Sequence, residues 1–332
     1  MSKRNLNKVQ KSAVESFGKP VLIFAGAGSG KTRVLTHKIA HLIDKDLVSA
    51  QNILAVTFTN KAAQEMRERV SKLLKNKNTS VNLGTFHSIC ARILRKEIHH
   101  LGYTADFSIF DVKDQVTLVK VVLEAMDIPK NYVTPQEVRH KISYFKNKLI
   151  HPDEAQSKAH LVIEKTYAEI YKNYQKALFE NNAVDFDDLL ILPLQLFEKN
   201  PKVLEKYRED WQYILVDEYQ DTNKPQFMLI KYLAGSHKQV CVVGDDDQSI
   251  YGWRGADIRN ILDFEKTFGN CEVFKLEKNY RSSGHILEAA SSVVKNNDNR
   301  APKELIAHND VGEKLGLIET HDEMEEADAV VN

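Results

Sequence analysis

The sequence has few cysteines and no net charge. Its three cysteines, Cys90, Cys241 and Cys271, stand far apart, which argues against both a disulfide framework and a zinc site. We interpret them as small buried apolar side chains. Lysines plus arginines equal aspartates plus glutamates, 46 of each, so any attraction to nucleic acid has to come from local patches rather than from the whole chain.

Long apolar runs are also missing. The longest, such as VLIFA and LLILPLQLF, fall far short of the roughly 20 residues that a membrane-spanning helix needs. The polar, cationic start MSKRNLNK lacks the apolar core of a signal peptide. We therefore expect a soluble, cytoplasmic protein with no membrane partner, and its 332 residues predict two or three domains.

Short apolar, β-branched runs recur along the chain and predict the strands of a parallel sheet. Each is bounded by glycine or polar residues, and most are followed by apolar residues at helical spacing, a pattern typical of an α/β domain. The runs are PVLIFA (20–25), ILAVTF (53–58), YILVDE (213–218), QVCVVGD (239–245) and EVFKLEK (272–278).

The strand pattern stops between about residues 109 and 205, where the sequence predicts helices throughout. Thr134 as an N-cap and Glu137 as its capping-box partner predict a helix over 135–148. Residues 152–182 have apolar positions three or four apart and predict one long helix. The simplest account is an all-helical insertion between strands of one sheet.

The sequence ends in an acidic stretch. From Asn309 onward, NDVGEKLGLIETHDEMEEADAVVN carries eight acidic residues and one lysine. Its last part has the pattern of an acidic first helical turn followed by apolar residues. We expect either a natural acidic tail or a piece of a longer protein.

A glycine-rich loop follows the first predicted strand. FAGAGSGKTRVL (24–35) is close to the G-x-x-x-x-G-K-[ST] pattern when it is read from Ala25-Gly26 through Gly30-Lys31-Thr32, with Ala25 at the position of the first glycine. Glycines let backbone N–H groups wrap a phosphate, while Lys31 would neutralise the β- and γ-phosphate oxygens and Thr32 would offer its hydroxyl to Mg²⁺. The predicted phosphate-binding residues are Gly26, Ala27, Gly28, Ser29, Gly30, Lys31 and Thr32.

A pair of carboxylates supplies the second half of a nucleotide site. In YILVDEYQDTN (213–223) an apolar strand delivers Asp217 and Glu218 at its carboxyl end. Asp217 suits a direct or water-mediated contact with Mg²⁺, and Glu218 suits polarisation of an attacking water. A solvated acidic turn is the alternative, but a P-loop enzyme needs such a pair on a neighbouring strand.

Eight motifs occur in the order and approximate spacing of the UvrD/Rep/PcrA-like superfamily 1 DNA helicases, which the chain resembles over about residues 5–332. They are LNKVQ (6–10), AGAGSGKT (25–32), AVTFTNKAAQEMRERV (55–70), GTFHSICARILR (84–95), DFDDLL (185–190), LVDEYQDTN (215–223), GDDDQSIYGWRGAD (244–257) and LEKNYRSS (276–283).

The resemblance implies a site for ATP with Mg²⁺. Gln10 would read the adenine edge, because an amide pairs in bidentate fashion with N6 and N7. Tyr280 would stack on the adenine, Arg33 would close the other side of the base or ribose, and Arg281 would reach the γ-phosphate. The implied catalytic residues are Lys31, Asp217, Glu218, Gln248 and Arg281, and the implied Mg²⁺ ligands are Thr32 and Asp217.

Single-stranded DNA is the second ligand that the resemblance implies. Hydroxyl, amide and imidazole groups would hold phosphates, and aromatic faces would stack on bases. The implied DNA-binding residues are Thr57, Phe58, Asn60, Thr85, His87, Tyr251, Trp253 and Arg254. We expect no metal at His87, and a structural histidine is the alternative there. We interpret Asp245 as a structural or Mg²⁺-shell residue and assign no role to Asp246 or Asp247.

The implied fold is a RecA-like P-loop NTPase sheet with an all-helical insertion and the start of a second RecA-like domain. Residues 1–108 and 206–277 would form the first motor domain. Residues 109–205 would form the insertion, and 278–332 would open the second motor domain.

The implied function is an ATP-dependent DNA helicase that couples hydrolysis to movement along single-stranded DNA and to duplex unwinding at single-strand/double-strand junctions. Polarity of 3′ to 5′ and replication-linked DNA repair follow from the resemblance alone. Relatives continue into a further motor segment, which carries an arginine that completes the ATP site. No equivalent of that segment follows Tyr280-Arg281 in this sequence. Such an arginine contributes about 10³–10⁵ in rate, so we expect this chain, without the missing C-terminal motor domain, to be a weak ATPase or inactive.

Three other functions stay open. A recombination helicase-nuclease subunit shares these motifs but has longer insertions and a nuclease domain. A non-hydrolysing, ATP-gated DNA-binding scaffold would not need Lys31, Asp217, Glu218 and Gln248 together. A nucleoside or small-molecule kinase would not need the aromatic motif at 244–257.

Overall fold

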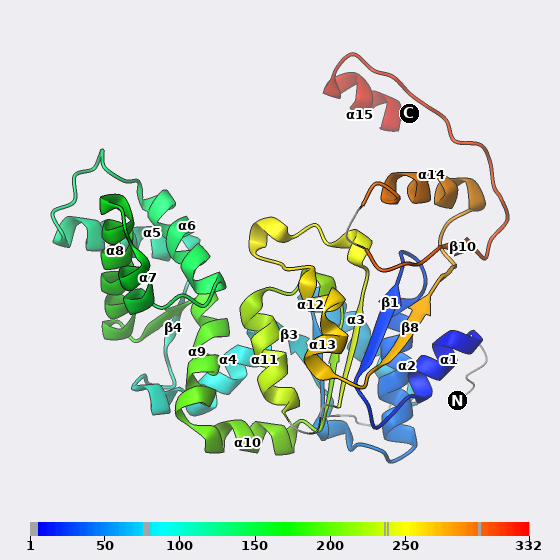
Figure 1. Ribbon diagram of the computed structural model, residues 1–332, viewed down its shortest axis with the longest axis horizontal. Coiled ribbons are helices and arrows are strands. Elements are labelled where there is room, and N and C mark those ends of the chain that lie inside the picture. Colours follow the sequence, from blue (N-terminus) through cyan, green and yellow to red (C-terminus); the bar gives the residue numbers. More distant parts are fainter. Residues whose placement is uncertain (1–5, 76–79, 236, 238, 298–299, 332) are drawn as a thin grey trace.

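The computed structural model describes residues 6–75, 80–235, 237, 239–297 and 300–331. Its centre is a six-stranded parallel sheet in the order β3-β2-β6-β7-β1-β8 (Figure 1). The strands are β1 (Val21–Ala25), β2 (Ile53–Thr57), β3 (Asn82–Thr85), β6 (Tyr213–Val216), β7 (Val240–Gly244) and β8 (Glu272–Leu276). All five apolar runs are therefore strands of one parallel sheet, which confirms the predicted α/β class.

Two apolar cores cover the two faces of this sheet. Alternate residues of a strand point to opposite faces, so Leu22 and Phe24 join one core while Val21 and Ile23 join the other. Helices α1 (Lys8–Glu15), α2 (Lys31–Asp44) and α3 (Asn60–Leu73) cover one face. The other face is covered by α4 (Phe86–Glu97), α9 (Phe186–Lys199), α10 (Pro201–Asp210), α11 (Lys224–Ala234), α12 (Arg259–Leu262) and α13 (Phe264–Phe268). Cys90 and Cys241 are buried in these cores, as predicted, and Cys271 is half-buried.

The inserted lobe, residues 111–182, lies to one side of the sheet with an apolar core of its own (Figure 1). It consists of α5 (Val112–Ala125), α6 (Pro135–Asn147), α7 (Pro152–Lys158) and α8 (Val162–Glu180). The capping box of Thr134 and Glu137 is present at the start of α6, as predicted.

Two expectations about the insertion were wrong. The interval is not helical throughout, because β4 (Ser108–Phe110) and β5 (Ala183–Asp185) form a parallel pair at the base of the lobe. Each strand has only three residues, too few to show an alternating pattern. The single long helix over 152–182 is two helices, because the backbone is extended at Ala159 and Leu161 between α7 and α8.

Helices α9 and α10 belong to the core of the sheet rather than to the lobe. Leu190, Leu194 and Phe197 of α9 pack in the same apolar cluster as strands β2, β6 and β7. The helices that pack on the sheet thus begin before residue 205, where we expected the insertion to end.

The last part of the chain follows β8. Strand β9 (Lys278–Asn279) pairs in parallel with β10 (Ile306–Ala307), and α14 (Gly284–Val294) and the exposed α15 (Glu323–Val331) complete it (Figure 1). Short 3₁₀ turns are η1 (Ala50–Asn52), η2 (Ile98–Leu101), η3 (Tyr219–Asp221), η4 (Asp246–Gln248) and η5 (Gly252–Arg254). Within the described ranges, every helix is too short or too polar to cross a membrane.

Candidate nucleotide and nucleic-acid sites

The glycine-rich loop joins β1 to α2, as the phosphate motif requires. Gly28 and Gly30 have φ values of 66° and 93°, which are left-handed conformations that favour glycine. The Ser29 hydroxyl donates to the Gly26 carbonyl at 2.7 Å and closes the turn. The loop therefore leads into the N-terminus of α2, where backbone N–H groups and the helix dipole favour a phosphate.

Gln10 is buried and tied to this loop. Its Nε2 donates to the Ser29 carbonyl at 2.9 Å, and its Oε1 accepts from the Asn7 backbone N–H at 3.0 Å. Both ends of the amide are thus bonded within the protein, and each keeps one further hydrogen-bonding position, the second N–H of Nε2 and the second lone pair of Oε1. Arg33 is half-buried on the first turn of α2. Gly30 lies close to both Gln10 and Arg33, because a Cβ added at Gly30 would be 3.1 Å from Gln10 Nε2 and 3.7 Å from Arg33 Cβ.

The predicted carboxylate pair faces the loop. Lys31 Nζ lies 2.9 Å from Glu218 Oε2, and Glu218 has a left-handed φ of 48°. Asp217 is buried at the end of β6; burial and then the neighbouring Glu218 charge raise its pKa to about 7, although Lys31 acts in the opposite direction. The oxygens of Thr32 and Asp217 are of the kind that Mg²⁺ prefers, so the donor set fits the ion.

The turn after β8 lies directly against the phosphate loop. Asn279 is buried and donates from Nδ2 to the Ala27 carbonyl at 2.6 Å, while its Oδ1 accepts from the Arg281 backbone N–H at 2.8 Å. The Tyr280 backbone N–H donates to the Gly28 carbonyl at 2.9 Å. The Tyr280 hydroxyl accepts from Asn7, the N-cap of the helix that carries Gln10. The predicted ATP residues of both chain ends thus meet at one loop.

Gln220 connects Glu218 of the predicted carboxylate pair to the loop after β7. Its Nε2 donates to Glu218 Oε2 at 2.9 Å, and its Oε1 accepts from the Asp245 backbone N–H at 2.9 Å. Asp245 in turn accepts from Gln248 Nε2 at 2.6 Å. The loop that carries Gln248 is therefore bonded to the residues that face Lys31.

A row of aromatic side chains continues from that loop. The rings of Phe58 and Tyr251 lie 5.0 Å apart, and those of Tyr251 and Trp253 lie 6.3 Å apart. The Arg254 guanidinium sits 4.6 Å from the Trp253 ring centre, and Trp253 is 75% exposed. Three exposed or half-exposed π faces in a row suit stacking of successive bases.

The remaining predicted DNA residues lie at the adjacent strand ends. Thr57 and Thr85 are register partners on β2 and β3. Thr57 is buried and its hydroxyl donates to the Thr59 carbonyl, while the Thr85 hydroxyl caps α4. Asn60 is exposed at the start of α3. His87 packs against Phe186, and burial lowers its pKa, so the imidazole is neutral near pH 7.

The three carboxylates after β7 form an ion-pair cluster. Lys303 lies 2.8 Å from Asp245 and 2.9 Å from Asp247, and it also contacts Asp246. Arg300 pairs with Asp247 at 3.0 Å. Asp246 and Asp247 therefore have a structural partner that the sequence did not reveal, because the lysine is more than fifty positions away in a polar stretch.

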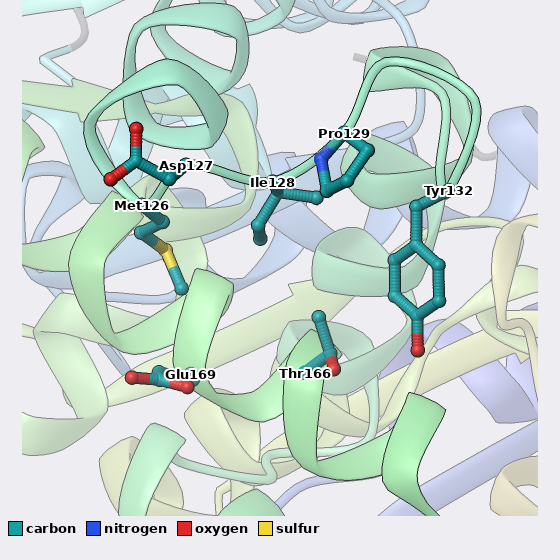
Figure 2. Close-up of a pocket in the computed structure, with 7 residues that line it drawn as sticks. All are labelled: Met126, Asp127, Ile128, Pro129, Tyr132, Thr166 and Glu169. Carbon is teal, nitrogen blue, oxygen red and sulfur yellow. The ribbon is translucent and has the colours of Figure 1, made fainter.

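A separate pocket lies on the inserted lobe, on the connection between α5 and α6 and one face of α8. Figure 2 shows its lining, which contains none of the predicted ATP or DNA residues. The lining residues are Met126, Asp127, Ile128, Pro129, Tyr132, Thr166 and Glu169. The nucleotide and DNA residues gather instead at the carboxyl edge of the sheet, where ligands of open α/β folds bind.

Comparisons with known proteins agree with this geometry. Residues 6–269 match the model of the UvrD/REP helicase N-terminal domain. The chain belongs to this helicase family. Residues 274–332 match the model of the UvrD-like helicase C-terminal domain.

Curated relatives extend the same conclusion. The chain is 48% identical over 325 residues to the ATP-dependent DNA helicase PcrA of Bacillus subtilis (strain 168), a match that covers 98% of this chain and 44% of the relative. It is 49% identical over 327 residues to the protein of the same name from Staphylococcus aureus (strain Mu50), which covers 98% and 45%. The chain thus spans less than half the length of these relatives.

Sequence reasoning missed three residues that bridge segments of the candidate site. Gln220, Asn279 and Lys303 connect predicted residues by hydrogen bonds or ion pairs. Gln220 and Asn279 stand inside motifs that the family resemblance had identified, which was the only available signal. Nothing in the sequence pointed to Lys303.

Proposed function

We propose that the chain binds ATP with Mg²⁺ and single-stranded DNA as part of an ATP-dependent DNA helicase. The observation that carries this proposal is continuity between two groups of residues. Lys31 contacts Glu218, Gln220 joins Glu218 to Asp245, and the following loop carries the exposed aromatic Trp253. A nucleotide-dependent shift at one end of this network would move the other.

Each group has a defined part in this mechanism. Thr32 and Asp217 would hold Mg²⁺, which would neutralise charge on the phosphates. Lys31 binds the terminal phosphates, which releases Glu218 from its present ion pair to orient a water. Gln248 and Arg281 contact the γ-phosphate, and Gln10, Arg33 and Tyr280 hold the base and ribose. Thr57, Asn60, Thr85 and His87 hold DNA phosphates beside the aromatic row.

The finer parts of the function rest on the family resemblance. We propose 3′-to-5′ movement on single-stranded DNA, unwinding at single-strand/double-strand junctions and work in replication-linked DNA repair. We also propose four segments, 1–108, 109 to about 185, about 186–277 and 278–332. The second boundary is moved from 205 because α9 and α10 pack with the sheet.

Substitution of Trp253 tests the proposed stacking of bases on the aromatic row. A base stack contributes about 1–3 kcal/mol, so Trp253→Ala should weaken binding of a labelled oligo-dT by about 5-fold to 100-fold. Affinity for a fluorescent ATP analogue should stay within about twofold. Fluorescence anisotropy measures the first and direct titration the second.

The matched control is Tyr132→Ala, which removes another exposed aromatic side chain on the inserted lobe, outside the row. It should leave DNA binding unchanged. Equal loss of ATP and DNA affinity in Trp253→Ala would assign Trp253 a folding role, and unchanged DNA affinity would refute the proposed stacking.

A further inference from the structure

The buried lysine of the C-terminal part occupies an unusual environment. The side chain of Lys303 is 3% exposed, and its ammonium is shared by Asp245, Asp246 and Asp247. Burial opposes its charge, but the three carboxylates more than compensate, so its pKa is raised and the amine stays protonated. Such a group is held in one place, because a buried charge is tolerated only with its partners fully engaged.

Asp245 passes this restraint on to Gln248. One carboxylate oxygen, Oδ1, contacts Lys303, and the other, Oδ2, accepts from Gln248 Nε2 at 2.6 Å. The Gln248 backbone N–H also donates to the Asp245 carbonyl at 2.9 Å. The lysine therefore fixes the orientation of the carboxylate, and the carboxylate fixes the amide.

We propose that Lys303 is a positioning residue for Gln248 and acts through Asp245. Lys303 lies in the segment that matches the C-terminal domain of the family, and Gln248 lies in the segment that matches the N-terminal domain. Through this contact, the C-terminal segment controls how the Gln248 amide is oriented toward the γ-phosphate. This inference rests on the proposed role of Gln248.

The test compares the affinity of the full chain for a non-hydrolysable fluorescent ATP analogue with its affinity for the matching ADP analogue. Gln248→Ala should lower the ATP/ADP affinity ratio several-fold, and Lys303→Met should lower it by a similar factor. The matched control is Arg300→Met, which removes an ion pair to Asp247 in the same cluster without touching the Asp245–Gln248 contact. It should leave the ratio unchanged.

A double variant separates positioning from simple charge imbalance. Asp246→Asn with Lys303→Met removes one charge of each sign, so the cluster keeps its net charge, yet the ratio should still fall. The combination Lys303→Met with Gln248→Ala should have no larger effect than either change alone, because both act on one contact. Melting temperatures of all variants show which of them fold.

The outcomes distinguish the two proposals. A wild-type ratio near one, or a ratio that Gln248→Ala does not change, refutes the role of Gln248 and the inference with it. If Gln248→Ala lowers the ATP/ADP affinity ratio but the folded Lys303 variants keep the wild-type ratio, the inference about Lys303 is refuted and the role of Gln248 is not. Full additivity of the two changes also refutes the inference.

Discussion

Asp217 illustrates how a single residue of the candidate site lowers the stability of the fold. In the unfolded chain an aspartate ionises near pH 4. In the folded chain, burial and the nearby Glu218 charge raise the pKa of Asp217 to about 7. Folding therefore takes up a proton between these pH values, so stability falls as the pH rises from about 4 to 7. Above pH 7 the full cost is present, about 4 kcal/mol as an upper bound.

Asp217→Asn should remove this cost. In Mg²⁺-free buffer at pH 8 the variant should be more stable than the wild type by about 2–4 kcal/mol, and the difference should shrink toward pH 4. Urea unfolding at pH 4.5, 6 and 8 measures it. Asp44→Asn, at an exposed position on α2, is the control and should show little difference at any pH. A gain that is the same at all three values would contradict the assignment.

The sequence predicted site residues where their chemistry is local. Lys31 and Thr32 follow a strand and open a helix, so the loop motif alone placed them. The contact between Lys303 and Asp245 joins segments with no shared pattern, and only tertiary packing creates it. The bond from Gln10 to the Ser29 carbonyl was unpredictable for the same reason, whereas its bond with Asn7 belongs to a local capping box.

At the scale of elements, a buried ion pair fastens the inserted lobe to the sheet domain. Lys146 of α6 lies 2.7 Å from Asp185 and 2.8 Å from Asp188, at the start of α9. Next to it, Asn147 donates to Asp187 and accepts from Asn223, the N-cap of α11. The lobe thus contacts the segment that follows Asp217 and Glu218.

Lys146→Met should destabilise the chain strongly. It leaves two buried carboxylates without their cation, a change that costs about 3–5 kcal/mol. Lys158→Met, which breaks the exposed pair with Glu154, is the control and should cost less than about 1 kcal/mol. Chemical unfolding followed by circular dichroism compares them. A similar loss of unfolding free energy in both variants would show that the buried pair stabilises the chain no more than the exposed pair does.

Elements were predictable where burial imposes a long pattern. β1 and β7 are buried at every position, and their apolar runs predicted them. The three residues of β4 and of β5 carry no such pattern, and their pairing depends on how α5 and α8 bring them together. The break between α7 and α8, before Val162, contains no proline or glycine, so the local sequence did not predict it.

At the scale of the whole molecule, the stretch between β10 and α15 stands out by its exposure. Residues 311–319 are all exposed and form neither helix nor strand, and Leu317 is 94% exposed. Proteases cut such segments before they cut packed helices and strands.

Brief trypsin treatment should therefore cleave first after Lys314. The expected products are a large fragment that ends at this residue and a short C-terminal peptide, both identified by mass spectrometry of the intact digest. Lys314→Gln should slow that first cleavage. Early cuts within the sheet or the inserted helices would contradict the packing described above.

The pairing of β1 also sets an order of events during synthesis. Val21 lies opposite Cys241 on one side and Glu272 on the other, so the strand waits for both partners until most of the chain has been made. At about 5–20 residues per second, synthesis from residue 21 to residue 272 takes roughly 13–50 s. The helices of the inserted lobe bury most of their apolar side chains against one another, and the last of these helices is complete once residue 180 has emerged. The insertion can thus fold on the ribosome before the sheet that it interrupts.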